Sequence, residues 1–120
     1  MRSSESFEGL EVWRRSKALA VEVCRASANL KDWGFRDQIT RSAVSVPSNI
    51  AEGAERNGAK EFIQFLGIAK GSLGELRTQV MIGMELGYYE EPIAQAWIAE
   101  TRELAKMHHG LIQSLRGTST

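Results

Sequence analysis

With 120 residues, 42% of them apolar and 25% charged, the chain has the size and composition of one soluble globular domain, 1–120, and is too short for two. Its fifteen basic and fifteen acidic side chains cancel, so it lacks the basic excess typical of a dedicated nucleic-acid-binding protein. Cys24 is the only cysteine and no apolar run approaches the roughly 18 residues of a membrane span. We therefore expect a cytoplasmic protein with no internal disulfide and no membrane contact.

The first predicted helix covers about residues 8–30 and is apolar on two sides. At about 100° per residue, Leu10 and Trp13 fall on one side and Val23 falls on another, with a polar strip between them. So wide an apolar arc needs more than one neighbouring helix to cover it. Lys17 falls between Leu10 and Trp13, so we expect it to extend along the apolar side or to pair with a carboxylate of another helix or subunit.

The second predicted helix, about 33–55, follows Asp32 as its N-cap and carries two stripes side by side. The apolar stripe holds Phe35, Ile39, Ala43, Val46, Ile50 and Ala54. The polar stripe holds Gln38, Ser42, Ser45, Asn49 and Arg56, with Glu52 at its border. A hydrogen-bonding stripe beside the apolar face indicates that this helix is more than a simple surface helix.

Pro47 lies inside the second helix, where it removes a backbone donor and clashes with the carbonyl four residues earlier. Three nearby side chains are close enough to supply partners for the freed carbonyls, those of Ser45, Ser48 and Asn49. The polar stripe itself has two interpretations. It lines a pocket or groove within reach of Glu75 and Arg77, or it is a buried network that fixes helix register or subunit orientation, which is the interpretation we favour.

The third predicted helix covers about 59–86, after a break at Asn57 and Gly58. Its core arc consists of Phe62, Phe65, Leu66, Ala69, Leu73, Leu76, Val80 and Met84. A second line has almost no side chains and holds Gly67, Gly71, Gly74 and Thr78. Each mid-helix glycine costs up to about 1 kcal/mol relative to alanine. The line therefore predicts close backbone approach by another helix, and predicts that Gly71→Leu disrupts folding or assembly.

The fourth predicted helix covers about 92–115 and follows a C-cap at Gly87. Pro92 lies near its first position, and two acidic residues precede it at the positive end of the helix dipole. Its apolar face holds Ile93, Trp97, Leu104, Leu111 and Leu115. Short loops between four long helices predict an all-α protein, an antiparallel up-down-up-down four-helix bundle.

The four predicted helices cannot cover all of their apolar surface by packing against one another. Ile68, Ile82 and Leu86 fall on the polar side of the third helix, and the first helix is apolar on two sides. In a soluble protein such a surplus indicates a protein interface, although scattered exposed apolar residues are also common. We expect a ring-like homo-oligomer, because most soluble oligomers are homomeric and closed.

Residues capable of catalysis or metal binding are few. A di-iron bundle needs Glu-x-x-His on two helices, whereas His108 and His109 are adjacent and neither has a glutamate three residues earlier. We expect His108 to be a hydrogen-bonded core or boundary residue and His109 to be solvated. Cys24 lies among apolar residues and is predicted to be a buried, inert thiol. We therefore predict no catalytic residue, no metal and no cofactor.

Two sets of residues are candidates for a function. The first set is predicted to pack helices 2 and 3 or to form their polar network: Gln38, Ser42, Ser45, Pro47, Asn49, Glu52, Gly53, Gly67, Gly71, Ser72, Gly74 and Glu75. The second set could contact nucleic acid: Arg14, Arg25, Arg36, Arg41, Arg56, Lys60, Lys70 and Arg77. Acidic residues are interspersed among these cations, as on an ordinary solvated surface, but a ring would repeat even weak basic patches around its axis.

Several segments carry a family resemblance over nearly the whole chain: Phe7–Trp13, Gln38–Gly53, Arg56, Lys60–Leu66 and Ala69–Leu76. In combination they resemble the small bacterial four-helix-bundle proteins named after the intervening sequences of 23S ribosomal RNA genes. The resemblance implies a homopentameric ring or barrel of bundles without known enzymatic activity. Similar proteins include the accessory factor of diversity-generating retroelements, a basic pentamer that binds nucleic acid and a reverse transcriptase; the present chain differs from it in being neutral overall.

Three functions follow as hypotheses. The first is a non-enzymatic homo-oligomeric scaffold or adaptor, pentameric by resemblance, whose partner is RNA, DNA or a protein that handles them. The second is direct nucleic-acid binding through the cations named above, which would weaken steeply with salt. The third is a small-molecule or metal-dependent bundle enzyme, which metal analysis of the purified protein would test.

Overall fold

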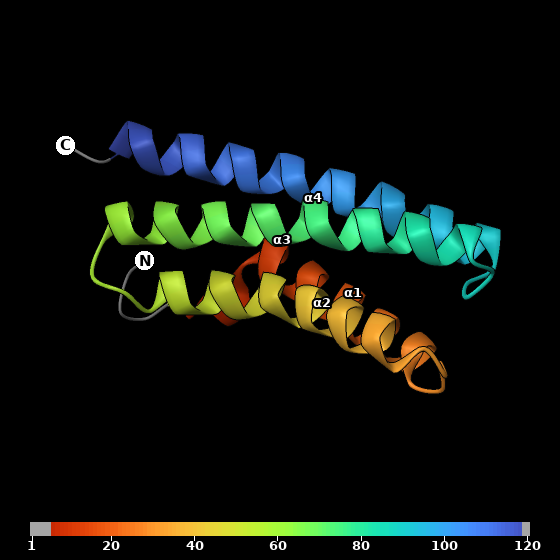
Figure 1. Ribbon diagram of the computed structural model, residues 1–120. Helices are drawn as coiled ribbons and strands as arrows, with labels where there is room; N and C mark the ends of the chain where they lie inside the picture. Colours follow the sequence, from red (N-terminus) through yellow and green to blue (C-terminus); the bar gives the residue numbers. More distant parts are fainter. Residues whose placement is uncertain (1–5, 119–120) are drawn as a thin grey trace.

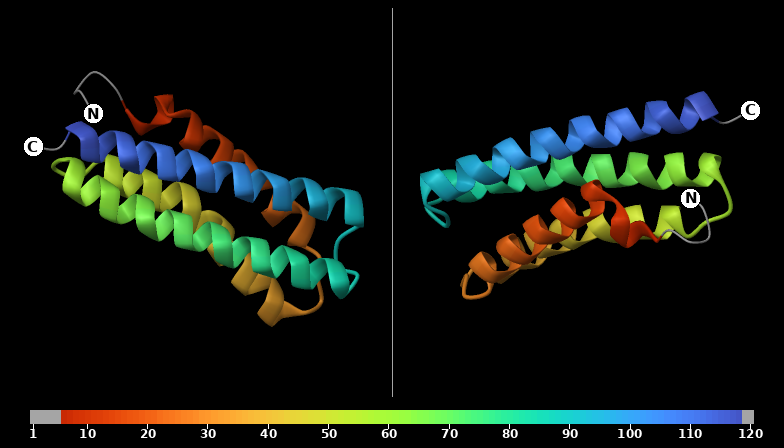
Figure 2. Two further views of the ribbon diagram at one scale, coloured as in Figure 1. Left: turned by 90° about the horizontal axis from the view of Figure 1, so that it is seen from above. Right: turned by 180° about the vertical axis from the view of Figure 1, so that it is seen from behind.

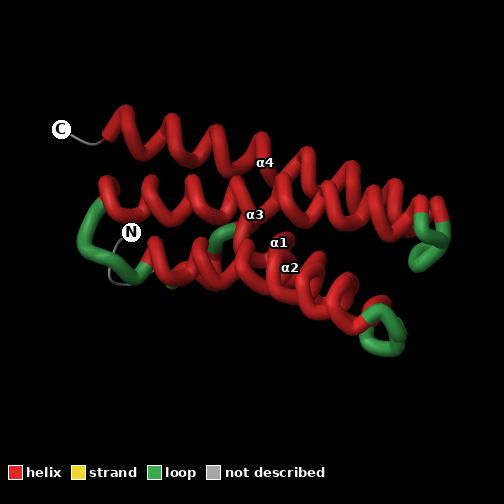
Figure 3. Tube along the Cα trace, viewed as in Figure 1, coloured by secondary structure: helices red, strands yellow, loops and turns green. Residues whose placement is uncertain are grey.

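The computed structural model describes residues 6–118, and within them every regular element is a helix. A single 3-10 turn, η1 (Phe7–Gly9), precedes four α-helices: α1 (Glu11–Ser27), α2 (Trp33–Ala54), α3 (Ala59–Glu85) and α4 (Glu91–Thr118). Short loops join them at the two ends of a molecule of 48 × 20 × 20 Å (Figures 1 and 3). The α2–α3 loop lies at one end, and the α1–α2 and α3–α4 loops lie at the other (Figure 1).

The helices pack in chain order. The two views of Figure 2 show α1 beside α2 and α3 beside α4, and α2 and α3 share the longest contact. The contact between α1 and α4 is the smallest among the four α-helices. No described helix combines the length and the apolar composition that crossing a bilayer requires.

Local signals set the helix ends. The Asp32 carboxylate accepts a hydrogen bond from the Phe35 N–H at 3.1 Å, as an N-cap should, and Gly87 ends α3 with φ +78°. The Tyr88 N–H then donates to the Gly83 carbonyl at 2.8 Å, which completes a Schellman turn. Both predicted caps are confirmed.

The predicted bounds of the first helix, 8–30, are too wide. Leu10 is extended (φ −77°, ψ 126°) and separates η1 from α1, because Ser6 caps the short turn by accepting from the Glu8 N–H. At the other end α1 stops at Ser27, and the Leu30 N–H donates back to the Ser27 carbonyl. The last helix is longer than predicted and extends to Thr118.

The core contains residues from all four helices. The predicted apolar stripe of α2 is confirmed, since Ile39, Ala43, Val46 and Ile50 are at most 1% exposed. Of the two apolar sides predicted for α1, the side with Val12, Leu19 and Val23 is buried. The other side is covered only in part, and its Val21 is 40% exposed.

Close helix contacts occur at glycines other than the predicted line. A Cβ atom at Gly53 would lie 2.6 Å from Cβ of Phe65, and one at Gly83 would lie 2.6 Å from the ring of Tyr89. A Cβ at Gly67, Gly71 or Gly74 would meet nothing within 4 Å. The close approach predicted for this line is therefore wrong within one chain: periodicity placed these glycines on one face of α3, and that face points outward.

Aromatic side chains join the helix ends at the α3–α4 loop. The Tyr89 hydroxyl lies 2.6 Å from the Ser27 hydroxyl at the end of α1, and the Tyr88 hydroxyl donates to Asp32 at 2.7 Å. The Tyr89 ring also meets the Trp97 ring edge to face, with centroids 5.1 Å apart. The loop thus contacts the end of α1, the N-cap of α2 and the Trp97 ring of α4.

Candidate functional site

Part of the polar stripe of α2 faces α3 and forms a row of hydrogen bonds, here called the polar row. It consists of Ser42, Ser45 and Asn49 of α2 with Ser72 and Gln79 of α3. Ser42 is 2% exposed and donates to the amide oxygen of Gln79, and the hydroxyls of Ser45 and Ser72 lie 2.9 Å apart. Asn49 donates to both the carbonyl and the hydroxyl of Ser45, at 2.8 and 2.9 Å. These bonds are compatible with one register of α2 against α3.

Pro47 leaves α2 helical across its whole length. The carbonyl that loses its usual donor is that of Ala43. Asn49 donates to the carbonyl of Ser45 and not to that of Ala43, and Ser48 is exposed. The buried proline ring instead lines an apolar hollow on the outer side of α1 and α2, described below.

A polar hollow of about 360 Å³ opens beside the row and is lined by Gln38, Arg41, Ser42, Glu75 and Gln79. Glu75 therefore lies next to the polar stripe, as expected. Arg77 does not, because its guanidinium turns to α4 and donates to the hydroxyl and the carbonyl of Thr101 at 2.9 and 3.3 Å. Glu52 pairs with Arg56 of its own helix at 2.6 Å.

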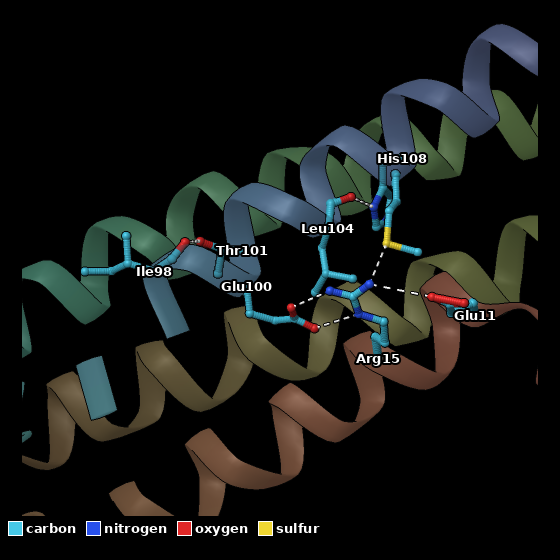
Figure 4. A network of polar contacts seen from close by, with 8 residues as sticks. Glu11, Arg15, Ile98, Glu100, Thr101, Leu104 and His108 are labelled. Carbon is cyan, nitrogen blue, oxygen red and sulfur yellow. Dashed lines mark hydrogen bonds and ion pairs between the residues drawn. The ribbon is translucent and has the colours of Figure 1, made fainter. Parts of the chain in front are cut away.

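The contact between α1 and α4 holds the main charged cluster (Figure 4). Arg15 binds Glu100 through two nitrogens, at 2.6 and 3.0 Å, and lies 3.6 Å from a carboxylate oxygen of Glu11. The hydrogen bond to Glu100 is the main reason that the pKa of Arg15 lies above its ordinary value. No local pattern predicts this pair, since its members are separated by 85 positions.

The predictions for the two histidines are confirmed. His108 is fully buried and its Nδ1 lies 2.7 Å from the Leu104 carbonyl, while His109 is exposed. Burial lowers the pKa of His108, and its Nε2 has no hydrogen-bond partner among residues 6–118. A buried imidazole bonded to its own helix in this way holds its place by packing and by that hydrogen bond.

Cys24 is half-buried rather than fully buried, and burial raises the pKa of its thiol. A raised pKa lowers the fraction of reactive thiolate. Across the part of the chain that the structure describes, no three His, Cys, Asp or Glu side chains converge where they could hold a metal ion.

The eight cations predicted to contact nucleic acid do not gather in one patch. Arg25, Arg56, Arg41 and Lys70 line four different surface hollows. Others are engaged within the chain: Arg14 donates to the Gly9 carbonyl at 2.8 Å, Arg36 pairs with Asp37 at 3.6 Å, and Arg77 binds Thr101. Lys60 is exposed.

The comparison with protein families is decisive for the classification. Residues 8–110 match the family described as 23S rRNA-intervening sequence protein. The chain belongs to this family. The match covers α1, α2 and α3 completely and most of α4, so it includes the polar row and the glycine line. No curated protein matches the chain.

The described residues leave two faces with exposed apolar side chains. The first, called the α1–α2 hollow, has a volume of about 320 Å³ and is lined by Lys17, Ala20, Val21, Cys24, Arg25, Val44 and Pro47. The second, called the α3 glycine face, consists of Gly67, Gly71 and Gly74 with the exposed Ile68 and Ile82 beside them. Lys17 extends along the apolar side of α1, the first of its two predicted arrangements: it is exposed and its ammonium lies 5.0 Å from the centre of the Trp13 ring.

Proposed function

We propose that this protein is a non-enzymatic cytoplasmic scaffold. In this proposal an antiparallel up-down-up-down bundle assembles into a closed homopentameric ring, which acts as an adaptor in RNA or DNA transactions. The observation that carries the proposal is the apolar surface that four packed helices leave uncovered, namely the α1–α2 hollow and the α3 glycine face. The family resemblance supplies the number five.

The exposure of individual side chains supports assembly through these faces. Val44 beside the α1–α2 hollow and Ile68 on the α3 glycine face are each 47% exposed, and Ile82 is 46% exposed. Large apolar side chains gathered on two sites favour a protein partner over water. The absence of Cβ atoms along the α3 glycine face would let another helix approach its backbone closely.

Both faces also carry charged side chains. Lys17 and Arg25 flank the α1–α2 hollow, whereas Lys60 and Glu75 share the face of α3 that carries the glycines, as their helical positions show. A contact between two different faces is heterologous, so it generates either a closed ring or an open filament. The homopentameric ring proposed here is the closed form of such a contact.

The polar row supports the non-enzymatic part of the proposal. Its hydroxyls and amides bond one another, across α2 and α3 at Ser42–Gln79 and Ser45–Ser72 and within α2 at Asn49–Ser45. Groups that satisfy one another in this way fix a register, and a general base would need a free lone pair directed at a substrate.

The native mass of the purified protein tests the scaffold proposal. Gly71→Leu and Ile82→Glu change residues that face open space or solvent within one chain, so we expect each variant to keep its helical circular dichroism and to lose the assembly. Ala99→Glu, on the exposed surface of α4, is the matched control and keeps the assembly. A wild-type protein that is monomeric at micromolar concentration would overturn the proposal, as would an intact pentamer of both face variants.

A further inference from the structure

The outward face of α4 carries a line of basic residues that lies outside the predicted set of cations. Arg102, Lys106, His109 and Arg116 follow one another at intervals of four, three and seven residues and are all exposed. These intervals place them on one side of a helix, over about 20 Å at about 1.5 Å per residue.

Lys70 of α3 extends this line sideways. With Ala105, Lys106 and His109 it lines an open hollow of about 300 Å³ between α3 and α4. The five residues Lys70, Arg102, Lys106, His109 and Arg116 are called the α4 basic ridge below.

The charges of the α4 basic ridge are not neutralised by the bundle. Among residues 6–118, no ion pair involves Lys70, Arg102, Lys106 or Arg116, in contrast to Arg15 with its partner Glu100. From Gln95 to Gly117 the acidic residues are Glu100, which is held by Arg15, and Glu103. A protein with zero net charge thus concentrates positive charge on one face.

The chemistry of the ridge points to a phosphate backbone. Three arginine and lysine side chains along about 20 Å of α4, with Lys70 beside them, match an extended polyanion, because duplex DNA carries a phosphate every 3.4 Å or so along each strand. The small residues between the cations, among them Ala105 and Gly110, give no apolar anchor of the kind that a membrane-surface helix inserts. Trp97 is buried in the core and offers no ring on which a base could stack.

We propose that the α4 basic ridge binds the phosphate backbone of nucleic acid without reading its sequence. This inference names a partner for the scaffold proposed above, but a single bundle already carries the whole ridge, so the inference does not depend on the ring. In a ring each copy would add an equivalent ridge, and the copies would bind a long strand together.

Fluorescence anisotropy with labelled 20-base-pair RNA and DNA duplexes of two unrelated sequences, in a series of NaCl concentrations, tests the inference on the full chain. We expect similar affinities for the two sequences and a steep loss of affinity with salt. The triple variant Lys70→Gln, Arg102→Gln, Lys106→Gln should weaken binding by about tenfold or more and reduce the salt slope by about 2 to 3, since each lost phosphate contact removes about 0.9.

A control variant with the same change in net charge separates the ridge from general electrostatics. Lys31→Gln, Arg41→Gln, Lys60→Gln removes three exposed cations outside the ridge, and we expect it to bind within about twofold of the wild type. Absence of binding at low salt, equal losses in both triple variants, or binding to phosphatidylserine vesicles instead of duplexes would each overturn the inference. The Ile82→Glu variant keeps the ridge, so measurable duplex binding by a monomer would separate this inference from the ring.

Discussion

The contact between α2 and α3 and the contact between α1 and α4 are both bridged by polar side chains, yet they are built on different principles. The first is long and tight, with neutral hydroxyls and amides of the polar row in its interior and Gly53 against Phe65. The second is short and held by the Arg15–Glu100 pair, whose side chains are 35% and 29% exposed beside a hollow of about 230 Å³. A buried hydrogen bond between neutral groups fixes geometry, and breaking it lowers stability because one partner is left unsatisfied. A partly exposed ion pair contributes little to stability.

Overpacking the tight contact should have the largest effect. Gly53→Val forces a branched side chain into a position where even a Cβ would lie 2.6 Å from Phe65, and we expect a loss of about 3 kcal/mol in urea unfolding. Gly67→Ala is the matched control, because it meets open space within the chain and should raise helix stability by up to about 1 kcal/mol. Similar unfolding midpoints for the two variants would show that the α2–α3 contact is not tight.

Unpairing the polar row should have the next largest effect. Ser42→Ala leaves the buried amide oxygen of Gln79 without its donor, at an expected cost of about 1 to 2 kcal/mol. The double variant Ser42→Ala, Gln79→Leu removes both polar groups and should recover most of that loss. A double-mutant cycle from denaturant unfolding checks this coupling, and additive losses would mean that the two side chains do not depend on each other.

Removing the charged pair should have a smaller effect. We expect Arg15→Gln to cost no more than about 1 kcal/mol, because the pair with Glu100 is partly exposed. Unfolding measured in 0.05 M and 1 M NaCl checks the cause: the cost should shrink in high salt, while that of Ser42→Ala should not change. A cost independent of salt would place the pair in a drier environment than its exposure indicates.

The pH dependence should be the smallest effect near neutral pH. Burial lowers the pKa of His108 in the folded protein, so the unfolded chain takes up its proton first and stability falls as the pH drops below about 6.5. His108→Leu should remove this dependence and His109→Gln should keep it, as read from thermal unfolding between pH 7.5 and 5. Asp32 acts at lower pH: the hydrogen bond from Tyr88, followed by that from the Phe35 N–H, lowers its pKa, so its contribution is lost only as the pH falls below about 4.

The sequence predicted the helices and the core of α2 because both depend on local spacing. Ile39 and Ile50 repeat at the period of a helix, and Asp32 and Gly87 act on backbone groups a few residues away. Periodicity states which residues share a face, but it does not state what covers that face. For this reason the glycine line of α3 predicts close approach by another helix without stating whether that helix belongs to the same chain, and within one chain the line faces outward.

The remaining features depend on distant parts of the chain. Arg15 meets Glu100 only because α1 and α4 pack together, and Lys70 joins the α4 basic ridge only because α3 lies beside α4. The ridge itself has a helical spacing, Arg102, Lys106, His109 and Arg116, that could have been found from sequence. The predicted set of cations ends at Arg77 and contains only Lys70 of the ridge.

The two tyrosines of the α3–α4 loop have a consequence for a strand bound to α4. Tyr89 bonds Ser27 and Tyr88 bonds Asp32, so the end of α1 and the start of α2 are both joined to the α3–α4 loop at one end of the bundle. Arg116 lies at the opposite end of α4, some 40 Å from the joined end at about 1.5 Å per residue. A strand bound at Arg116 would therefore contact α4 far from the hydrogen bonds that join the helix ends, and the Arg15–Glu100 pair lies between the two places.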